Sequence, residues 1–216
     1  MAAPRKTRVA VLISGRGSNM VALIEAAKDP AYPAEIVLVL SNRPDAAGLA
    51  RATASGIPAR AIDHTGFRDR ASFDAALDAE LRAADIDLVC LAGFMRIFTP
   101  DFVAGWAGRM LNIHPSLLPL FKGTHTHAQA LEAGVRLHGC TVHFVVPELD
   151  AGPIVAQAAI PVRQGDDPDS LADRVIVEER RLYPAVLALV AGGRARLEGD
   201  RVVIADAAPD GVLFSL

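Results

Sequence analysis

Short, continuously apolar segments alternate with longer amphipathic segments along most of the chain, and this alternation restricts the possible folds more than any other feature. Residues 9–13, 35–40 and 86–92 are almost wholly apolar and short, which is typical of buried strands. Strands that are apolar on both faces are covered on both sides, as in parallel sheets with helical crossovers. The pattern therefore predicts an α/β fold, a doubly wound and mostly parallel sheet whose parallel part lies in the first half.

The same patterns place the other elements. Helical periodicity after the first strand stops before Pro30, and Thr99 followed by Pro100 is typical of a helix start. We expect helices over residues 18–28, 46–55, 72–84, 100–106, 128–133 and 169–190, and further strands over 59–63, 110–113, 141–146, 154–162, 195–197 and 201–204. The tail from Ala205 shows no usable pattern. No repeat or linker is visible, and 216 residues fit one domain with a sizeable core.

Composition and charge narrow the functional class. Hydrophobic residues make up 51% and charged residues 22%, and the formal net charge is −3. This weakly acidic balance argues against general nucleic-acid affinity, which needs a basic footprint, but permits one small anionic ligand. No apolar run reaches the roughly 18 residues of a membrane span, and the charged start leads into an apolar run too short for a signal peptide. We expect a protein without membrane contact, in the cytoplasm.

The two cysteines, Cys90 and Cys140, lie in apolar stretches. They are most simply small buried hydrophobic residues in a reducing compartment. A disulfide or a catalytic role for either is the less favoured alternative.

The first motif is SGRGSN, residues 14–19, between the first strand and the first helix. Glycines let the backbone approach a ligand, and a helix N-terminus offers unpaired N–H groups, so the motif favours phosphate binding. The alternative is a tight glycine turn in which Ser18 merely caps the helix. Gly15 and Gly17 fit the dinucleotide fingerprint, but its third position holds Met20, which disfavours a nicotinamide cofactor.

The second motif is LNIHPSLLP, in which Asn112 and His114 stand two residues apart on an extended stretch and face the same side. Acyl transfer to an amine needs a hydrogen-bond donor for the developing oxyanion and a group that exchanges protons near neutral pH. A carboxamide and an imidazole meet these needs. A buried polar pair that satisfies the loop backbone is an equally open alternative.

The third motif places Asp150 after a strand and before Gly152 and Pro153. A carboxylate near an imidazole orients the ring and favours its charged form. Aspartate before glycine is also an ordinary turn residue, and the motif alone favours that reading.

Other catalytic classes find less support. A zinc site built from Asp150 and the nearby histidines is disfavoured, because their spacing matches no standard zinc pattern and no HExxH is present; these are His114, His125, His127, His138 and His143. A serine hydrolase lacks its GxSxG motif.

Six segments occur in one order between residues 9 and 193: VLISGRGSN, LAGFMRI, GRMLNIHPSLLP, KGTHTHAQAL, VHFVVPELDAGPI and a helix ending ERRLYP. Together they resemble the folate-dependent phosphoribosylglycinamide formyltransferases, the glycinamide ribonucleotide transformylases of purine synthesis. The resemblance implies a Rossmann-like formyltransferase fold and a single formyltransferase domain over residues 1–216. Its phosphate-binding half would cover about residues 8–105, and its catalytic and folate-binding half about residues 106–204.

The resemblance also implies roles for individual residues. The catalytic set falls on Asn112, His114 and Asp150, the phosphate-binding set on Gly17, Ser18 and Asn19, and the ribose contact on Glu179. The folate-binding set falls on Arg70, Met95, Arg96, Ile97, Phe98, Asn112, Val146, Pro147, Glu148 and Leu149.

The implied reaction is direct attack of the substrate amine on the formyl carbon of 10-formyltetrahydrofolate, a co-substrate, through a tetrahedral intermediate and without a metal. The implied partners are small molecules, and a monomer and a homodimer both remain open. Related methionyl-tRNA formyltransferases carry an additional C-terminal tRNA-binding domain, for which we expect no room here. Formyltetrahydrofolate deformylases carry an N-terminal regulatory domain, and a first strand starting at Val9 leaves no space for one. A formyltetrahydrofolate hydrolase and a non-catalytic nucleotide-binding module remain alternatives.

Overall fold

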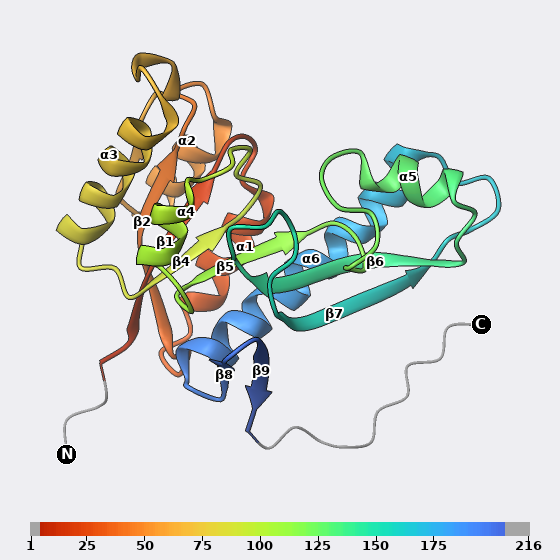
Figure 1. Ribbon diagram of the computed structural model, residues 1–216. Helices are drawn as coiled ribbons and strands as arrows, with labels where there is room; N and C mark the ends of the chain where they lie inside the picture. The colour runs from red at the N-terminus through yellow and green to blue at the C-terminus, as the bar shows by residue number, and fades with distance from the viewer. Residues whose placement is uncertain (1–4, 206–216) are drawn as a thin grey trace.

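A seven-stranded sheet forms the centre of the protein in the computed structural model, which describes residues 5–205 (Figure 1). The strand order is β3-β2-β1-β4-β5-β6-β7, and the first five of these strands are parallel to one another. β6 is antiparallel to both β5 and β7. The strands are β1 (Thr7–Ile13), β2 (Ala34–Ser41), β3 (Ala59–Ala61), β4 (Leu88–Leu91), β5 (Met110–His114), β6 (Leu137–Phe144) and β7 (Ile154–Pro161).

Helices cover both faces of this sheet, so the doubly wound fold predicted from the alternating pattern is confirmed (Figure 1). Side chains of α1 and α6 join the core on one face, and side chains of α3 and α4 join the core on the other. The helices are α1 (Ser18–Ala27), α2 (Ala47–Ala54), α3 (Arg70–Ala83), α4 (Pro100–Gly105), α5 (Thr126–Glu132) and α6 (Pro168–Ala191), with a short 3-10 turn η1 (His64–Gly66).

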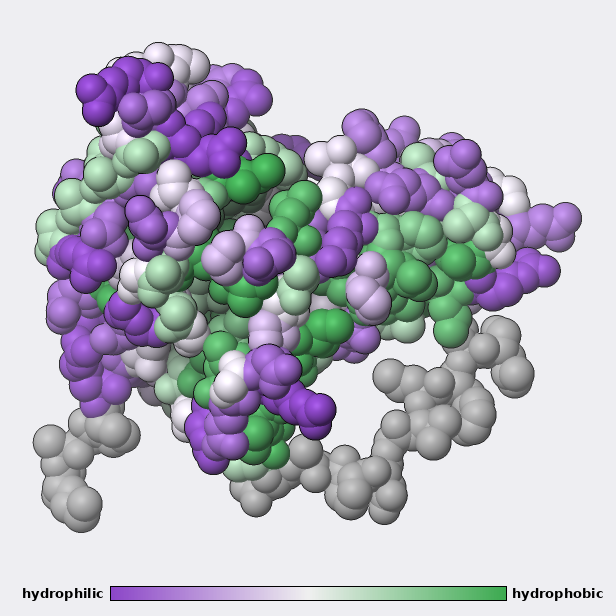
Figure 2. Space-filling view, in the orientation of Figure 1, coloured by the Kyte–Doolittle hydropathy of each residue, from purple (hydrophilic) through white to green (hydrophobic). Residues whose placement is uncertain are grey.

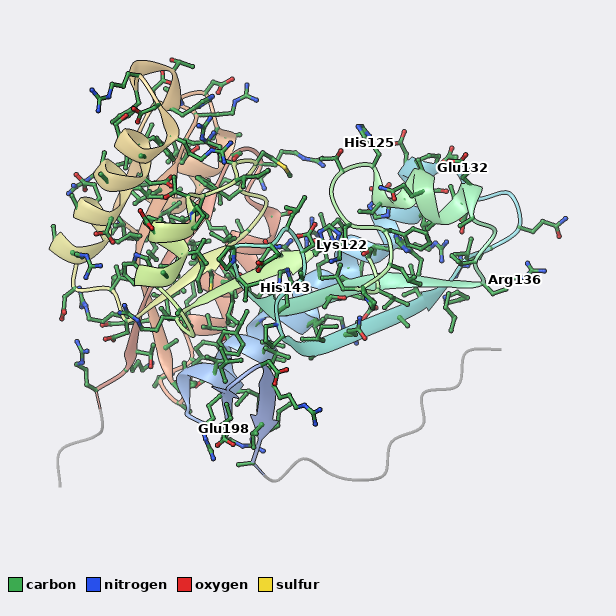
Figure 3. All side chains as sticks on the ribbon, in the orientation of Figure 1. Lys122, His125, Glu132, Arg136, His143 and Glu198 are labelled. Atoms are coloured by element: carbon green, nitrogen blue, oxygen red, sulfur yellow. The ribbon has the colours of Figure 1, made fainter. Side chains whose placement is uncertain are left out.

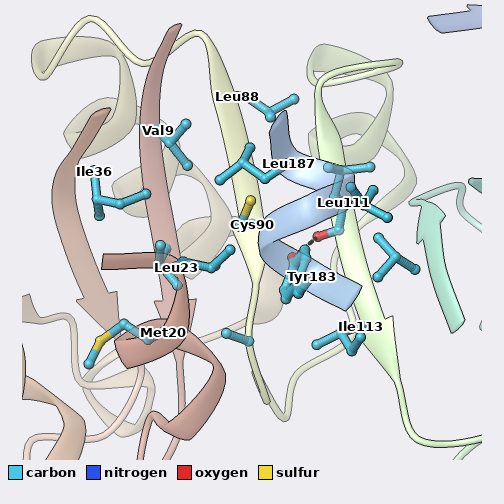
Figure 4. Packing of buried hydrophobic residues seen from close by; sticks show 14 of the residues in the cluster. Val9, Met20, Leu23, Ile36, Leu88, Cys90, Leu111, Ile113, Tyr183 and Leu187 are labelled. Atoms are coloured by element: carbon cyan, nitrogen blue, oxygen red, sulfur yellow. Dashed lines mark hydrogen bonds between the residues drawn. The ribbon is translucent and has the colours of Figure 1, made fainter. Parts of the chain in front are cut away.

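Tyr183 of α6 joins the first of these cores to the sheet (Figure 4). Its buried hydroxyl lies 3.1 Å from two carbonyl oxygens, that of Leu91 at the end of β4 and that of Leu111 within β5. Cys90 lies beside it, and burial raises the pKa of this thiol to about 12. Burial also raises the pKa of Cys140 to about 12. Both cysteines are buried and free, as expected from the sequence, and neither is poised as a nucleophile.

Element boundaries differ most at β6, which runs over Leu137–Phe144 rather than the expected residues 141–146. The sequence places a histidine and a glycine at its start, a combination that suggests a turn. In the structure, pairing with β7 extends to this stretch, with His138 opposite Ile160 and Gly139 opposite Ala159. A Cβ at Gly139 would lie 1.9 Å from the Ala158 carbonyl oxygen, so the close approach of β7 requires glycine there.

Two smaller predictions can be compared directly. α3 begins at Arg70, two residues before the expected start, because the Asp69 side chain accepts a hydrogen bond from the Ser72 N–H and caps the helix. The last two strands are confirmed as an antiparallel pair, β8 (Ala195–Glu198) and β9 (Arg201–Ile204). The tail beyond Ala205 lies outside the described residues. Within residues 5–205, no helix has both the length and the apolar character to cross a membrane.

Candidate active site

The loop after β1 opens helix α1 without a side-chain cap. Gly17, at the N-cap, adopts the left-handed conformation with φ of 70°, which favours glycine. Gly48 of α2 presses on this loop: its N–H donates to the Gly15 carbonyl oxygen at 3.0 Å, and a Cβ there would lie 2.4 Å from Ile13 Cδ1. The loop is thereby held from one side while the first N–H groups of α1 remain available to an anion.

Asn19 on α1 contacts Glu179 on α6, since its Nδ2 donates to Glu179 Oε2 at 2.6 Å. Both side chains are buried, and burial raises the pKa of Glu179 above its ordinary value. Among the described residues, no donor reaches the buried Oδ1 of Asn19. An unpaired acceptor at this place suits a ligand that brings a hydroxyl or an amine.

Asn112 on β5 stands directly opposite His143 on β6. Its Nδ2 donates to His143 Nε2 at 3.2 Å, while His143 Nδ1 donates to the Phe144 carbonyl oxygen at 2.9 Å. These two partners assign one tautomer to His143, with its hydrogen on Nδ1. Burial lowers the pKa of His143, so the ring stays neutral near pH 7. The neutral ring orients the carboxamide of Asn112, which keeps a second N–H for an oxygen in the site.

His114, two residues further along β5, has an oxygen facing each ring nitrogen. Nε2 lies 2.9 Å from the Phe121 carbonyl oxygen, and Nδ1 lies 3.6 Å from Asp150 Oδ2. The longer of these distances exceeds a direct hydrogen bond, so the Asp150 contact is electrostatic. A carbonyl oxygen and a carboxylate both accept hydrogen bonds, so each ring nitrogen of His114 faces an acceptor.

Asp150 is held by a hydrogen bond that its Oδ2 accepts from the Gly123 N–H at 2.8 Å. Its Oδ1 lies 4.0 Å from His143 Nε2, beyond hydrogen-bond distance. Its φ of 48° is in the left-handed region, which aspartate and asparagine adopt more readily than most residues. The structure thus brings the three residues expected to be catalytic into one cluster, with His143 as a fourth member.

A cavity of about 110 Å³ adjoins this cluster. Its wall includes Asn112, Asp150 and His143, and apolar residues such as Phe94 and Leu91. Eight of the residues that the sequence assigns to folate line it: Arg96, Ile97, Phe98, Asn112, Val146, Pro147, Glu148 and Leu149.

Two further residues assigned to folate do not line this cavity. Met95 is 71% exposed, and Arg70 lies on the surface at the start of α3. In the view of Figure 2, hydrophobic residues gather in the middle of the molecule, between the more hydrophilic surfaces over α3 and α5.

Arg96 gives this cavity its clearest ligand-directed feature. Its guanidinium carbon lies 5.0 Å from the centre of the Phe73 ring, and the buried Nε finds no acceptor within the described part of the chain. A buried donor without a partner is costly, so a ligand that brings an acceptor oxygen or nitrogen fits here.

His143 is the member of the site that motif reasoning missed, since the sequence suggests it only as one of several histidines. Figure 3 shows it on β6 in the middle of the molecule, below the loop that carries Lys122. Its position opposite Asn112 could be predicted only with knowledge of the β5–β6 register. The Phe121 carbonyl and the Gly123 N–H are backbone groups and leave no mark in a residue pattern.

The remaining histidines form no metal centre with Asp150. His127 Nδ1 lies 3.1 Å from His138 Nε2, and burial lowers the pKa of His138 to about 4. His125 is exposed on the surface. Across residues 5–205, the structure contains no group of three or more histidine, cysteine, aspartate or glutamate side chains placed to hold a metal ion.

Comparison with known proteins identifies the family of this chain. The formyl transferase family model matches residues 7–187, and the chain belongs to that family. Among curated relatives, the phosphoribosylglycinamide formyltransferase of Escherichia coli (strain K12) is 47% identical over 88% of this chain and 89% of its own length. A trifunctional purine biosynthetic protein adenosine-3 from Bos taurus is 53% identical over 90% of this chain, which spans only 19% of that longer protein.

Solved structures are similar to this chain in both fold and sequence. Glycinamide ribonucleotide transformylase 1 from Symbiobacterium toebii superposes with a TM-score of 0.90 at 46% identity, covering 93% of this chain and 95% of that one. Phosphoribosylglycinamide formyltransferase from Brucella melitensis gives a TM-score of 0.84 at 50% identity, covering 88% and 97% of the two chains.

Proposed function

We propose that this protein transfers the formyl group of 10-formyltetrahydrofolate to the amine of glycinamide ribonucleotide, a step of purine biosynthesis. The observation that carries the proposal is the cluster of Asn112, His114, Asp150 and His143 beside a cavity of about 110 Å³. The names of the similar proteins support the choice of the two substrates.

The nucleotide substrate is assigned to the loop at residues 14–19. The uncapped N–H groups that follow Gly17, with Ser18 and Asn19, bind its phosphate. Glu179 and the unpaired Oδ1 of Asn19 accept hydrogen bonds from its ribose hydroxyls. A phosphate at neutral pH offers no such donor, so we assign Oδ1 to the sugar.

The folate co-substrate is assigned to the cavity beside β5. The ring system lies between the apolar wall and residues 145–150, and Arg96 donates to one of its acceptors. Met95 and Arg70 are assigned to the rim, where the more exposed part of the folate passes.

Catalysis follows from the orientation of Asn112 and His114. As the amine attacks the formyl carbon, the second N–H of Asn112 donates to the oxygen that gains negative charge. His114, with Asp150 stabilising its imidazolium, balances the same charge and exchanges the protons that leave the amine and reach the departing folate nitrogen. No side chain is acylated and no metal takes part.

The wider assignments are part of the same proposal. Residues 1–216 form one formyltransferase domain, with the phosphate-binding half over about residues 8–105 and the catalytic half over about residues 106–204. It acts on small molecules in the cytoplasm, as a monomer or a homodimer.

One assay tests the function and separates it from its alternatives. Purified protein is mixed with 10-formyltetrahydrofolate, with and without glycinamide ribonucleotide, and loss of the formyl donor is followed. Loss that requires the amine is the expected result. Formate release without the amine would instead identify a hydrolase, and binding of the nucleotide without any turnover would identify a binding module.

A further inference from the structure

Ser14, the first residue after β1, holds the loop that follows β4. Its main-chain N–H donates to the Gly93 carbonyl oxygen at 3.1 Å, and its Oγ accepts the Met95 N–H at 2.7 Å. Ser14 is 7% exposed, so both contacts are shielded from water. One serine therefore fixes the start of the segment that continues into Arg96, Ile97 and Phe98 of the cavity wall.

The hydroxyl hydrogen of Ser14 has its own partner. It is donated at 2.5 Å to Oδ1 of Asn42, which follows β2 and is 3% exposed. The Asn42 carbonyl oxygen lies 2.8 Å from His64 Nδ1, which extends the network to η1. Because Ser14 Oγ accepts one hydrogen bond and donates another, it is already engaged on both sides and acts through the groups that it holds.

The bonds of the Ser14 side chain serve the loops rather than the sheet. The β1–β4 ladder pairs Val9 with Leu88 through to Leu12 with Leu91, and Ser14 lies beyond its end. On one side Ser14 continues into the loop at residues 14–19, and on the other it binds the segment at residues 93–98. Under the proposed function these two segments take different substrates, so Ser14 lies where the two subsites meet.

We propose that Ser14 is a positioning residue that couples the nucleotide and folate subsites, so that binding at one favours binding at the other. The coupling rests on the proposed function and acts through the Met95 N–H and the Asn42 side chain. When a ligand orders one of the two segments, the side chain of Ser14 becomes fixed in position. Ser14 then holds the other segment in place before the second ligand binds. Loss of the hydroxyl unpairs the partly buried Met95 N–H and removes this link.

The test is a coupling measurement by titration calorimetry. The Kd of glycinamide ribonucleotide is measured with and without saturating tetrahydrofolate, which carries no formyl group and permits no turnover. We expect the folate to tighten nucleotide binding at least about fivefold in the parent protein, the lower end of usual coupling. In Ser14→Ala the ratio of the two Kd values should fall to within about twofold of unity. A change in overall stability alone does not move this ratio.

Ser41→Ala is the matched control. Ser41 is 1% exposed at the end of β2, and among residues 5–205 its Oγ bonds only to the main chain of Arg43 in the same loop. Its removal should leave the ratio at the parent value. Should Ser14→Ala not fold, Ser14→Cys introduces a slightly larger side chain that is a weaker donor and acceptor, and it should show a reduced ratio.

The outcomes separate the two proposals. A parent protein that binds neither ligand overturns the proposed function itself. A parent that binds both ligands without coupling, or a folded Ser14 variant with the parent ratio, overturns the role of Ser14 and leaves the proposed function intact.

Discussion

Asp150→Asn removes one charge from the site and keeps the backbone that the position needs. Asp150 has a φ of 48°, and asparagine adopts this left-handed conformation readily. The carboxamide also keeps an oxygen that can accept the Gly123 N–H, now bonded at 2.8 Å. The variant should therefore fold, and its change in turnover should report the missing charge.

The magnitude follows from the contact with His114. Unit charges on Asp150 Oδ2 and His114 Nδ1, 3.6 Å apart, attract by about 4–5 kcal/mol at an effective dielectric constant of about 20. Loss of this attraction in the transition state corresponds to a factor of about 10³ in rate. We expect kcat to fall about 10²–10⁴-fold, the usual range for positioned acid–base groups, with KM changed much less.

The assay is steady-state loss of the formyl donor in the presence of the amine. Asp166→Asn is a matched control, since Asp166 is also a shielded carboxylate but binds Arg174 away from the site. If Asp150 is only a turn residue, asparagine serves the turn equally well. A well-folded Asp150→Asn protein with near-normal turnover would then refute the mechanism and leave His114 without its partner.

Three further predictions concern other parts of the protein. Gly17→Val places a β-branched residue at φ of 70°, with its Cβ 3.2 Å from Gly48 Cα. The variant should raise the KM of the nucleotide far more than that of the folate. An equal rise in both KM values would show that the phosphate site is misplaced. Activity should survive prolonged incubation with a chelator, and stoichiometric zinc whose removal abolishes turnover would overturn the metal-free reaction. Burial lowers the pKa of His138 from 6.5 to about 4. As the pH falls through this window, the imidazole becomes protonated in the unfolded chain but stays neutral in the native protein, so falling pH favours unfolding. Through His138, the free energy of unfolding should fall by about 2 kcal/mol when the pH is lowered from about 7 to about 5. Urea denaturation of the parent and of His138→Gln measures this loss, and an equal loss in both would exclude His138 as its source.

The parallel half of the sheet was predictable because its strands are marked by composition. Buried on both faces over most of their length, β1, β2 and β4 must be largely apolar, and the helices between them must be amphipathic. Motifs at the carboxyl ends of such strands meet at one edge of the sheet, as the loop after β1 and the segment after β4 do. In this part of the chain, the local sequence pattern is therefore enough to predict where an element lies in the fold.

The antiparallel half resists such prediction because its register depends on contacts distant in sequence. β6 begins at Leu137 only because β7 pairs with it there, and His143 meets Asn112 only because β6 returns beside β5. The partners of His114 and Asp150 include the Phe121 carbonyl and the Gly123 N–H, which any residue could supply. Side-chain types therefore indicate the acid–base residues but not the backbone groups that orient them.

The contact between Asn19 and Glu179 joins residues 160 positions apart in the chain. Contacts of such long range form late in folding, because the entropy cost of closing a large loop comes before the favourable free energy of the contact. On refolding from denaturant, helical signal should return before the proposed nucleotide site, which is incomplete until α6 packs beside α1. Recovery of nucleotide binding thus reports the docking of the last long helix.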